Sequence, residues 1–111
     1  MTPQELREAI TLASKIAREA GEILRKGKDA AIFATGVLVH ESMKAAEILK
    51  EEGIEVYVVN IHTIKPIDAK LIIDLAKKTN LVITAEDHNI IGGLGSAVAE
   101  VLSENYPCIM K

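Results

Sequence analysis

The sequence has few of the features that would tie a chain to a disulfide framework, a membrane or a nucleic acid. Cys108 is its one cysteine, so no disulfide can form within the 111 residues, and a cytoplasmic location is expected. No apolar run approaches the roughly 18 residues of a membrane helix. The net charge is −3, and no basic stripe is interleaved with aromatic residues. Neither a membrane nor a nucleic acid is therefore expected as a partner.

Aromatic residues are also scarce, at 3% of the chain with no tryptophan. The core must be built from Ile, Leu, Val and Ala, within a hydrophobic share of 49%. The charged share of 26% is typical of a globular protein. A chain of this length is expected to form a single domain, 1–111.

From residue 30 onward, short apolar runs alternate with amphipathic segments. The runs predict strands at 30–35, 56–61, 81–85 and 108–110, and the segments between them predict helices at about 39–52, 68–78 and 94–104. The runs are nearly continuous in apolar character, which is typical of parallel strands covered on both faces. The predicted fold is α/β, with three layers (α/β/α) around a four-stranded parallel sheet.

Residues 2–26 have the pattern of one long amphipathic helix. Thr2 and Glu5 form a capping box, and Pro3 suits the first helical position. Apolar residues recur every three or four positions, at Leu6, Ile10, Ala13, Ala17, Ala20 and Leu24. Gly27 is placed to end this helix. Residues 1–28 are thus predicted to be a helix added in front of an α/β domain at 29–111.

Each of the three histidines follows a different predicted strand. Parallel strands end at one edge of a sheet, so His40, His62 and His88 could approach one another there. Cys108 lies near the chain end and is no obvious fourth ligand, so no metal site is predicted. His62 opens the stretch His-Thr-Ile-Lys-Pro-Ile-Asp, which is interpreted as a rigid strand-to-helix connection.

The stretch from Glu86 to Ser96 is the most informative. Acidic, imidazole and amide groups follow a strand, and three glycines stand at the start of a helix. The glycines allow either close packing of that helix on the sheet or binding of an anion by free N–H groups. A dinucleotide fingerprint is rejected, because the third glycine is missing and the stretch follows the third strand instead of the first.

Several stretches together resemble the C-terminal domain of transketolase and its thiamine-diphosphate-dependent relatives. They include Ala34-Thr35-Gly36, His62 to Asp68, and Glu86 to Glu100, in order over about residues 30–110. The resemblance implies the strand order 2-1-3-4, which opens a crevice between the first and third strands. The candidate anion-binding residues at that edge are Gly36, His88, Asn89, Gly92, Gly93, Gly95 and Ser96.

The resemblance also bears on activity. In that family this domain follows two larger domains that bind thiamine diphosphate, and their Gly-Asp-Gly motif occurs nowhere in this chain. No catalytic residue carries over, no cofactor is expected, and the chain is expected not to be an enzyme but a non-catalytic structural or interaction domain. Two alternatives stay open: a regulatory domain that binds an anion or a phosphorylated metabolite, and the C-terminal part of a split transketolase.

Both ends of the chain depart from the family pattern. The family enters this domain through an antiparallel strand, where residues 2–26 are predicted to be helical, and continues past the position of Lys111 with a further strand and helix. Residues 10–26 resemble the first helix of the inositol monophosphatase family, so a chimera or an engineered chain is one interpretation. Helix 2–26 is expected to pack beside helix 39–52, within the chain or by exchange in a homodimer.

Overall fold

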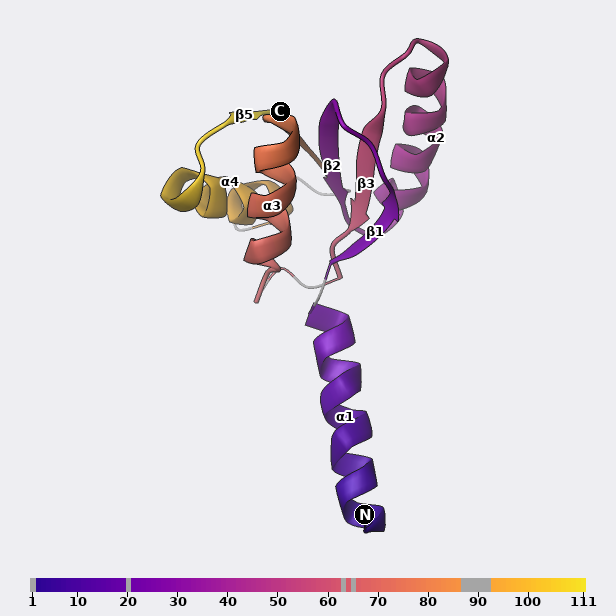
Figure 1. The fold of residues 1–111 in the computed structure, drawn as a ribbon, viewed down its shortest axis with the longest axis vertical. Coiled ribbons are helices and arrows are strands. Elements are labelled where there is room, and N and C mark those ends of the chain that lie inside the picture. The colour runs from indigo at the N-terminus through magenta and orange to yellow at the C-terminus, as the bar shows by residue number, and fades with distance from the viewer. Residues whose placement is uncertain (1, 20, 63, 65, 87–92) are drawn as a thin grey trace.

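The computed structural model describes residues 2–19, 21–62, 64, 66–86 and 93–111, with the backbone alone for 12–19. Five strands form one sheet in the order β1-β3-β2-β4-β5 (Figure 1). The strands are β1 (Glu22–Arg25), β2 (Ala30–Ala34), β3 (Val56–Asn60), β4 (Leu81–Ala85) and β5 (Ile109–Met110). The helices are α1 (Pro3–Glu19), α2 (Leu38–Glu51), α3 (Ala69–Thr79) and α4 (Leu94–Asn105).

The four predicted strands pair in parallel in the predicted order, here β3-β2-β4-β5. The prediction of a purely parallel four-stranded sheet is nevertheless wrong, because β1 adds a fifth strand, antiparallel to β3. Glu22 lies opposite Asn60 and Ile23 opposite Val59. The edge of β3 would otherwise present unpaired backbone N–H and C=O groups, and β1 satisfies them. The sheet is therefore mixed.

The predicted helix over residues 2–26 is too long. Its start is confirmed, since the Glu5 N–H donates to the Thr2 hydroxyl at 3.1 Å, but α1 ends at Glu19 and the chain becomes β1. Gly27 does not cap a helix. It passes the start of β3 so closely that a Cβ would lie 2.6 Å from the Val56 Cα. Pairing with β3 has overridden the helical periodicity of the sequence.

The helices divide between the two faces of the sheet as right-handed crossovers require. On one face α2 packs on Ala30, Ile32, Val56 and Val58. On the other, α3 and α4 pack on side chains that include Phe33, Val59 and Val82. The central strand β2 is buried along its whole length. None of the described helices is long and apolar enough to cross a membrane.

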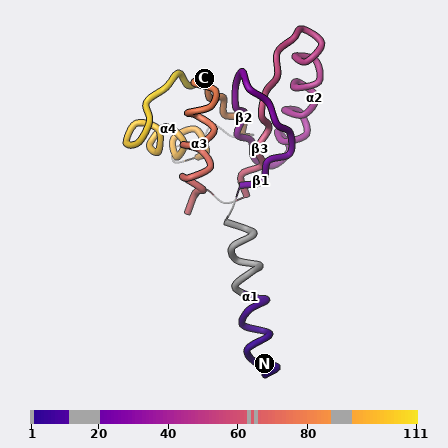
Figure 2. Tube along the Cα trace, in the orientation of Figure 1, coloured from indigo at the N-terminus to yellow at the C-terminus, as the bar shows by residue number. Residues whose placement is uncertain are grey.

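The first helix lies outside these layers. Figures 1 and 2 show α1 running away from the sheet, and Leu6 and Ile10 in its described part are 51% and 58% exposed. The expected packing beside α2 within the same chain is not seen. The physical reason is a tether: the Gly21 N–H donates to the Asp68 carboxylate at 3.0 Å. This bond fixes the start of β1 beside α3, on the face opposite α2.

Candidate functional site

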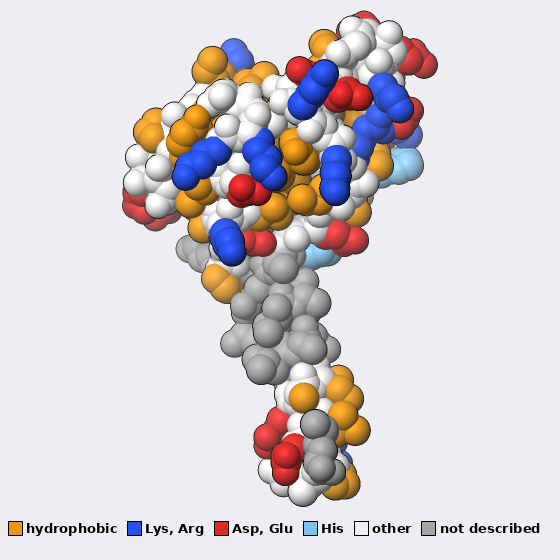
Figure 3. Space-filling view, in the orientation of Figure 1, with side chains coloured by type: hydrophobic (Ala, Val, Ile, Leu, Met, Phe, Trp, Pro, Cys, Tyr) orange, Lys and Arg blue, Asp and Glu red, His pale blue; other side chains and the backbone are white. Residues whose placement is uncertain are grey.

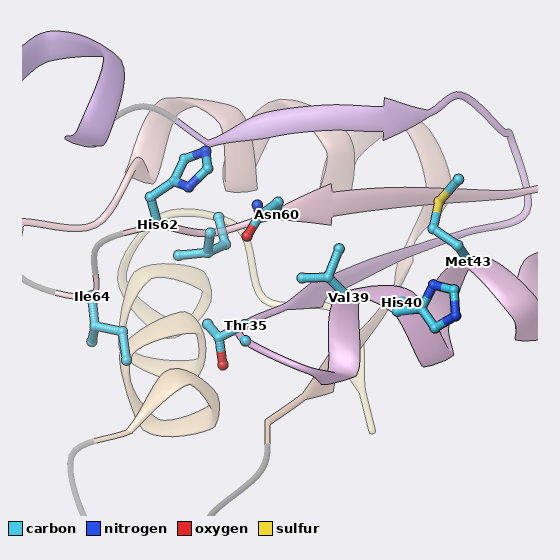
Figure 4. A pocket seen from close by; sticks show the side chains of 9 residues that line it. Thr35, Val39, His40, Met43, Asn60, His62 and Ile64 are labelled. Atoms are coloured by element: carbon cyan, nitrogen blue, oxygen red, sulfur yellow. The ribbon is translucent and has the colours of Figure 1, made fainter. Parts of the chain in front are cut away.

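An open pocket of about 920 Å³ lies where β2 and β3 end. The connection after β2 leaves to α2 on one face, and the connection after β3 leaves to α3 on the other, so the two segments diverge and open a crevice. Figure 4 shows the pocket. Its described lining is Thr35, Gly36, Val39, His40, Met43, Asn60, Ile61, His62 and Ile64.

The β2 side of the pocket is shaped by a tight turn. Gly36 has a φ of +57°, a left-handed conformation that favours glycine, and no atom within 4 Å would obstruct a Cβ there. The backbone conformation, not crowding, therefore calls for this glycine. The Leu38 N–H donates to the Thr35 carbonyl at 3.2 Å, and α2 begins without a side-chain cap. The first turns of α2 then place His40 on the pocket wall (Figure 4).

The β3 side brings an amide and an imidazole to the pocket. Asn60 ends β3 and lies in register with Ala34 of β2 and Glu22 of β1. The His62 Nε2 lies 3.4 Å from the Glu22 carboxylate, so β1 positions this ring. In Figure 4 His62 and His40 stand on opposite sides of the pocket. Amide, hydroxyl and imidazole groups are the hydrogen-bonding groups that a small polar or anionic molecule needs.

The residues predicted to bind an anion fall into three groups. Gly36 lines this pocket, which lies between β2 and β3 and not between β2 and β4. Gly93, Gly95 and Ser96 stand at the start of α4, where the Gly95 N–H donates to the Glu86 carboxylate at 3.3 Å. His88, Asn89 and Gly92 lie outside the described residues. The structure thus places Gly36 with His40 and His62, and Gly93, Gly95 and Ser96 elsewhere.

Sequence reasoning did not single out Asn60, and it interpreted His62 as part of a rigid connection. The sequence pattern that could have indicated them is Asn60, a polar residue at the end of the otherwise apolar strand β3, followed two residues later by His62. The described residues contain no group of three or more His, Cys, Asp or Glu side chains arranged to hold a metal ion.

Comparison with known proteins gives the family. The family described as "Transketolase, C-terminal domain" matches residues 19–109. The chain belongs to this family. It is 51% identical over 89 residues to "6-deoxy-6-sulfo-D-fructose transketolase subunit SqwH" of Clostridium sp. (strain MSTE9). The aligned residues are 80% of this chain and 28% of that protein. It is 53% identical over 85 residues to the "Putative transketolase C-terminal section" of Methanocaldococcus jannaschii, with 77% and 26% covered.

Solved structures agree with this family. One described as "Split gene transketolase, inactive beta4 tetramer" superposes with a TM-score of 0.81 at 47% identity, over 84% of this chain and 31% of that one. A 2-oxoglutarate:ferredoxin oxidoreductase from Magnetococcus marinus gives a TM-score of 0.61 at 16% identity, over 99% of this chain and 20% of that one. The second likeness shows the fold alone. The chain spans less than a third of each of these relatives.

Two expectations are corrected by these relatives. The expectation that the chain is not an enzyme is wrong as a statement about its family. Its relatives are transketolase subunits and 1-deoxy-D-xylulose-5-phosphate synthases, which are enzymes or parts of enzymes. In these relatives the matching domain is a part of an enzyme. The comparisons also give no support to an inositol monophosphatase segment, a chimera or an engineered chain. The family match begins at residue 19 and so includes β1.

Proposed function

We propose that this chain acts as the C-terminal section of a transketolase-type enzyme, with a structural, non-catalytic role within that enzyme. The observation that carries the proposal is the 51% identity to a transketolase subunit, over 80% of this chain. In this role the chain is a single domain that works in the cytoplasm, where it stabilises an assembly whose chemistry takes place on other domains.

Thiamine diphosphate is the cofactor that the family implies, and the described residues do not fit it. They offer no cluster of metal-ligating side chains for the accompanying ion, and the sequence has no Gly-Asp-Gly motif. No step of a ketol transfer is therefore assigned to side chains of this chain. The proposed contribution of this chain is to stabilise the assembly.

The test is complementation. The Clostridium subunit named above is prepared without the section that matches this chain, and this chain is added in trans. We expect a stable complex on gel filtration and a gain in transketolase turnover. A matched control is this chain with Ala46→Arg, because Ala46 lies on the buried face of α2 and an arginine there disrupts the domain. No complex and no gain with the intact chain would refute the proposal.

A second candidate function is regulation by a small anion or a phosphorylated metabolite. The supporting observation is the pocket at the ends of β2 and β3, where His40, His62, Thr35 and Asn60 converge. The residues at the start of α4, Gly93, Gly95 and Ser96, do not line this pocket and are kept as a separate candidate for anion binding.

Titration with inorganic phosphate, followed by heteronuclear NMR, tests this second function. We expect saturable shifts at Gly36 and Asn60 that weaken in His62→Gln. Saturable binding confined to residues outside this edge would count against it.

One of these relatives supports a proposal about oligomeric state. A split-gene transketolase forms a tetramer of identical chains, and we propose that this chain also associates with copies of itself. Equilibrium sedimentation tests it, and a mass equal to one chain at all concentrations would contradict it.

A further inference from the structure

The described lining of the pocket at the ends of β2 and β3 carries no permanent charge. It contains no Lys, Arg, Asp or Glu side chain, and its polar side chains are those of Thr35, His40, Asn60 and His62. An anion that leaves water loses hydration energy, which neutral hydrogen bonds restore only in part. Histidine can supply a positive charge, because an imidazole takes up a proton near about pH 6.5. The charge of this pocket therefore depends on pH.

Glu22 restricts what one of the two rings can offer. The His62 Nε2 lies 3.4 Å from the Glu22 carboxylate, and Figure 3 shows a histidine side chain beside an acidic one near the start of β1. An ionised carboxylate accepts a hydrogen bond but cannot donate one. The neutral ring is therefore favoured with its proton on Nε2 and a lone pair on Nδ1. Figure 4 shows the ring between the start of β1 and the rest of the pocket, so Nδ1 is the nitrogen that a bound molecule meets.

Taking up a proton reverses what the His62 ring offers. In the neutral ring the lone pair on Nδ1 repels an anion. In the protonated ring both nitrogens donate, so the Nε2–H stays directed to Glu22 while the Nδ1–H is available to the pocket. A hydrogen bond between ionised partners is also roughly twice as strong as a neutral one. The same nitrogen therefore rejects an anion in one state and binds it in the other.

From this geometry we infer that the pocket binds a small oxyanion, such as sulfate or phosphate, only when His62 is protonated. Glu22 is the positioning residue that sets this condition. The Thr35 hydroxyl and the Asn60 amide are neutral donors that complete the site. The inference rests on the second proposed function, which is anion binding at this pocket, and adds the condition under which the anion binds.

The other charged groups near the ring leave this condition in place. His40 stands on the opposite side of the pocket (Figure 4) and also gains charge as the pH falls, so it acts in the same direction. Asp68 is tethered to the start of β1, and both of its carboxylate oxygens accept backbone N–H groups. Glu41, next to His40 on α2, lies 3.6 Å from the Lys44 amine. Lys65 lies outside the described residues.

Titration with sulfate at two pH values tests the inference, because sulfate keeps its double negative charge at both. Calorimetry is done on the full chain at about pH 5.5 and about pH 8, on either side of the ordinary imidazole value. An ordinary imidazole is about thirtyfold more protonated at the lower pH, so we expect sulfate to bind about thirtyfold more tightly there. His62→Gln cannot take up a proton and should lose most of this ratio. His40→Gln is the comparison variant and should keep the larger part of it.

Glu22→Gln tests the positioning role. An amide can accept from Nε2 or donate to it, so both neutral tautomers of His62 become available, and sulfate should bind more tightly than to the parent at about pH 8. Glu41→Gln removes the same charge beside the other ring and is the matched control, which should bind sulfate as the parent does. Nitrogen-15 NMR of the parent at this pH should find the proton of the His62 ring on Nε2.

The outcomes separate the inference from the function on which it rests. Equal sulfate affinity at the two pH values would overturn the inference and leave anion binding at the pocket standing, whereas no binding at either pH would overturn both. A pH dependence kept in His62→Gln and lost in His40→Gln would contradict the choice of ring. A proton on Nδ1, or Glu22→Gln behaving like Glu41→Gln, would contradict the role of Glu22. Thermal unfolding of each variant shows that it is folded.

Discussion

Among the described glycines, Gly27 is the one where substitution by alanine should destabilise the fold most. The added Cβ would lie 2.6 Å from the Val56 Cα and 2.7 Å from the Tyr57 backbone nitrogen. Non-bonded carbon atoms prefer about 3.5–4.0 Å, so the chain must move by about 1 Å. The obstructing atoms are backbone atoms at the buried start of β3, and they cannot turn aside as a flexible side chain could.

The cost can be worked out from what that movement disturbs. Forcing extra atoms into a packed site costs about 1–3 kcal/mol. Directly after Gly27, the N–H groups of Lys28 and Asp29 donate to the Glu55 carbonyl at 3.0 and 2.8 Å, and each such bond contributes about 1 kcal/mol. If both bonds are lost, the total is about 3–5 kcal/mol. For a domain of this size it lowers the melting temperature by roughly 12–40 °C.

Differential scanning calorimetry measures the effect, with Gly95→Ala as the matched control. A Cβ on Gly95 would lie 3.5 Å from the Thr84 hydroxyl, an ordinary contact. Within a helix alanine is favoured over glycine by up to about 1 kcal/mol, so this variant should melt at the same temperature or a few degrees higher. A melting temperature for Gly27→Ala within about 3 °C of the parent would refute the reasoning.

Three further predictions concern single side chains. Asp68→Ala should cost about 2 kcal/mol in urea unfolding, because it removes a helix cap and the Gly21 tether. The hydrogen bond and then the charge of Arg25 lower the pKa of Glu47 below its usual 4.5. This contribution is present at neutral pH and lost as pH falls below 4.5, so Glu47→Gln should match the parent in stability at pH 3 and be slightly less stable at pH 7. Burial raises the pKa of the Cys108 thiol above 9.0, so its alkylation rate should still be rising beyond pH 9.0.

The central sheet could be predicted because local pattern and final environment agree. Strand β2 is buried on both faces, and its sequence is apolar at every position. The helix predicted at about 68–78 is observed as α3, with local chemistry at both ends: the Asp68 carboxylate accepts from the Leu71 N–H, and Asn80 adopts a left-handed φ of 57°. Short-range chemistry decides these features, so the sequence alone is informative.

The end of α1 could not be predicted in the same way. Ala20 and Leu24 continue the helical spacing, and residues 22–25 are too few to show a strand pattern against it. What selects the strand is the free edge of β3, whose residues are more than thirty positions away. Non-local pairing of this kind overrides local propensity, and single-sequence patterns do not show it.

That one error also concealed how the pocket is supported. While residues 22–25 were assigned to a helix, no strand was expected beside β3, although His40 and His62 were expected at one edge of the sheet. In the structure β1 brings Glu22 within 3.4 Å of His62 and pairs with Asn60. The edge strand β1 therefore contacts both of these pocket residues and helps to hold them in place. The strand missed in the fold and the residues missed in the site are consequences of the same pairing. A substitution that loosens β1, such as Gly27→Ala, should therefore also broaden the NMR signals of Asn60 and His62, and unchanged signals would show that the pocket stands without it.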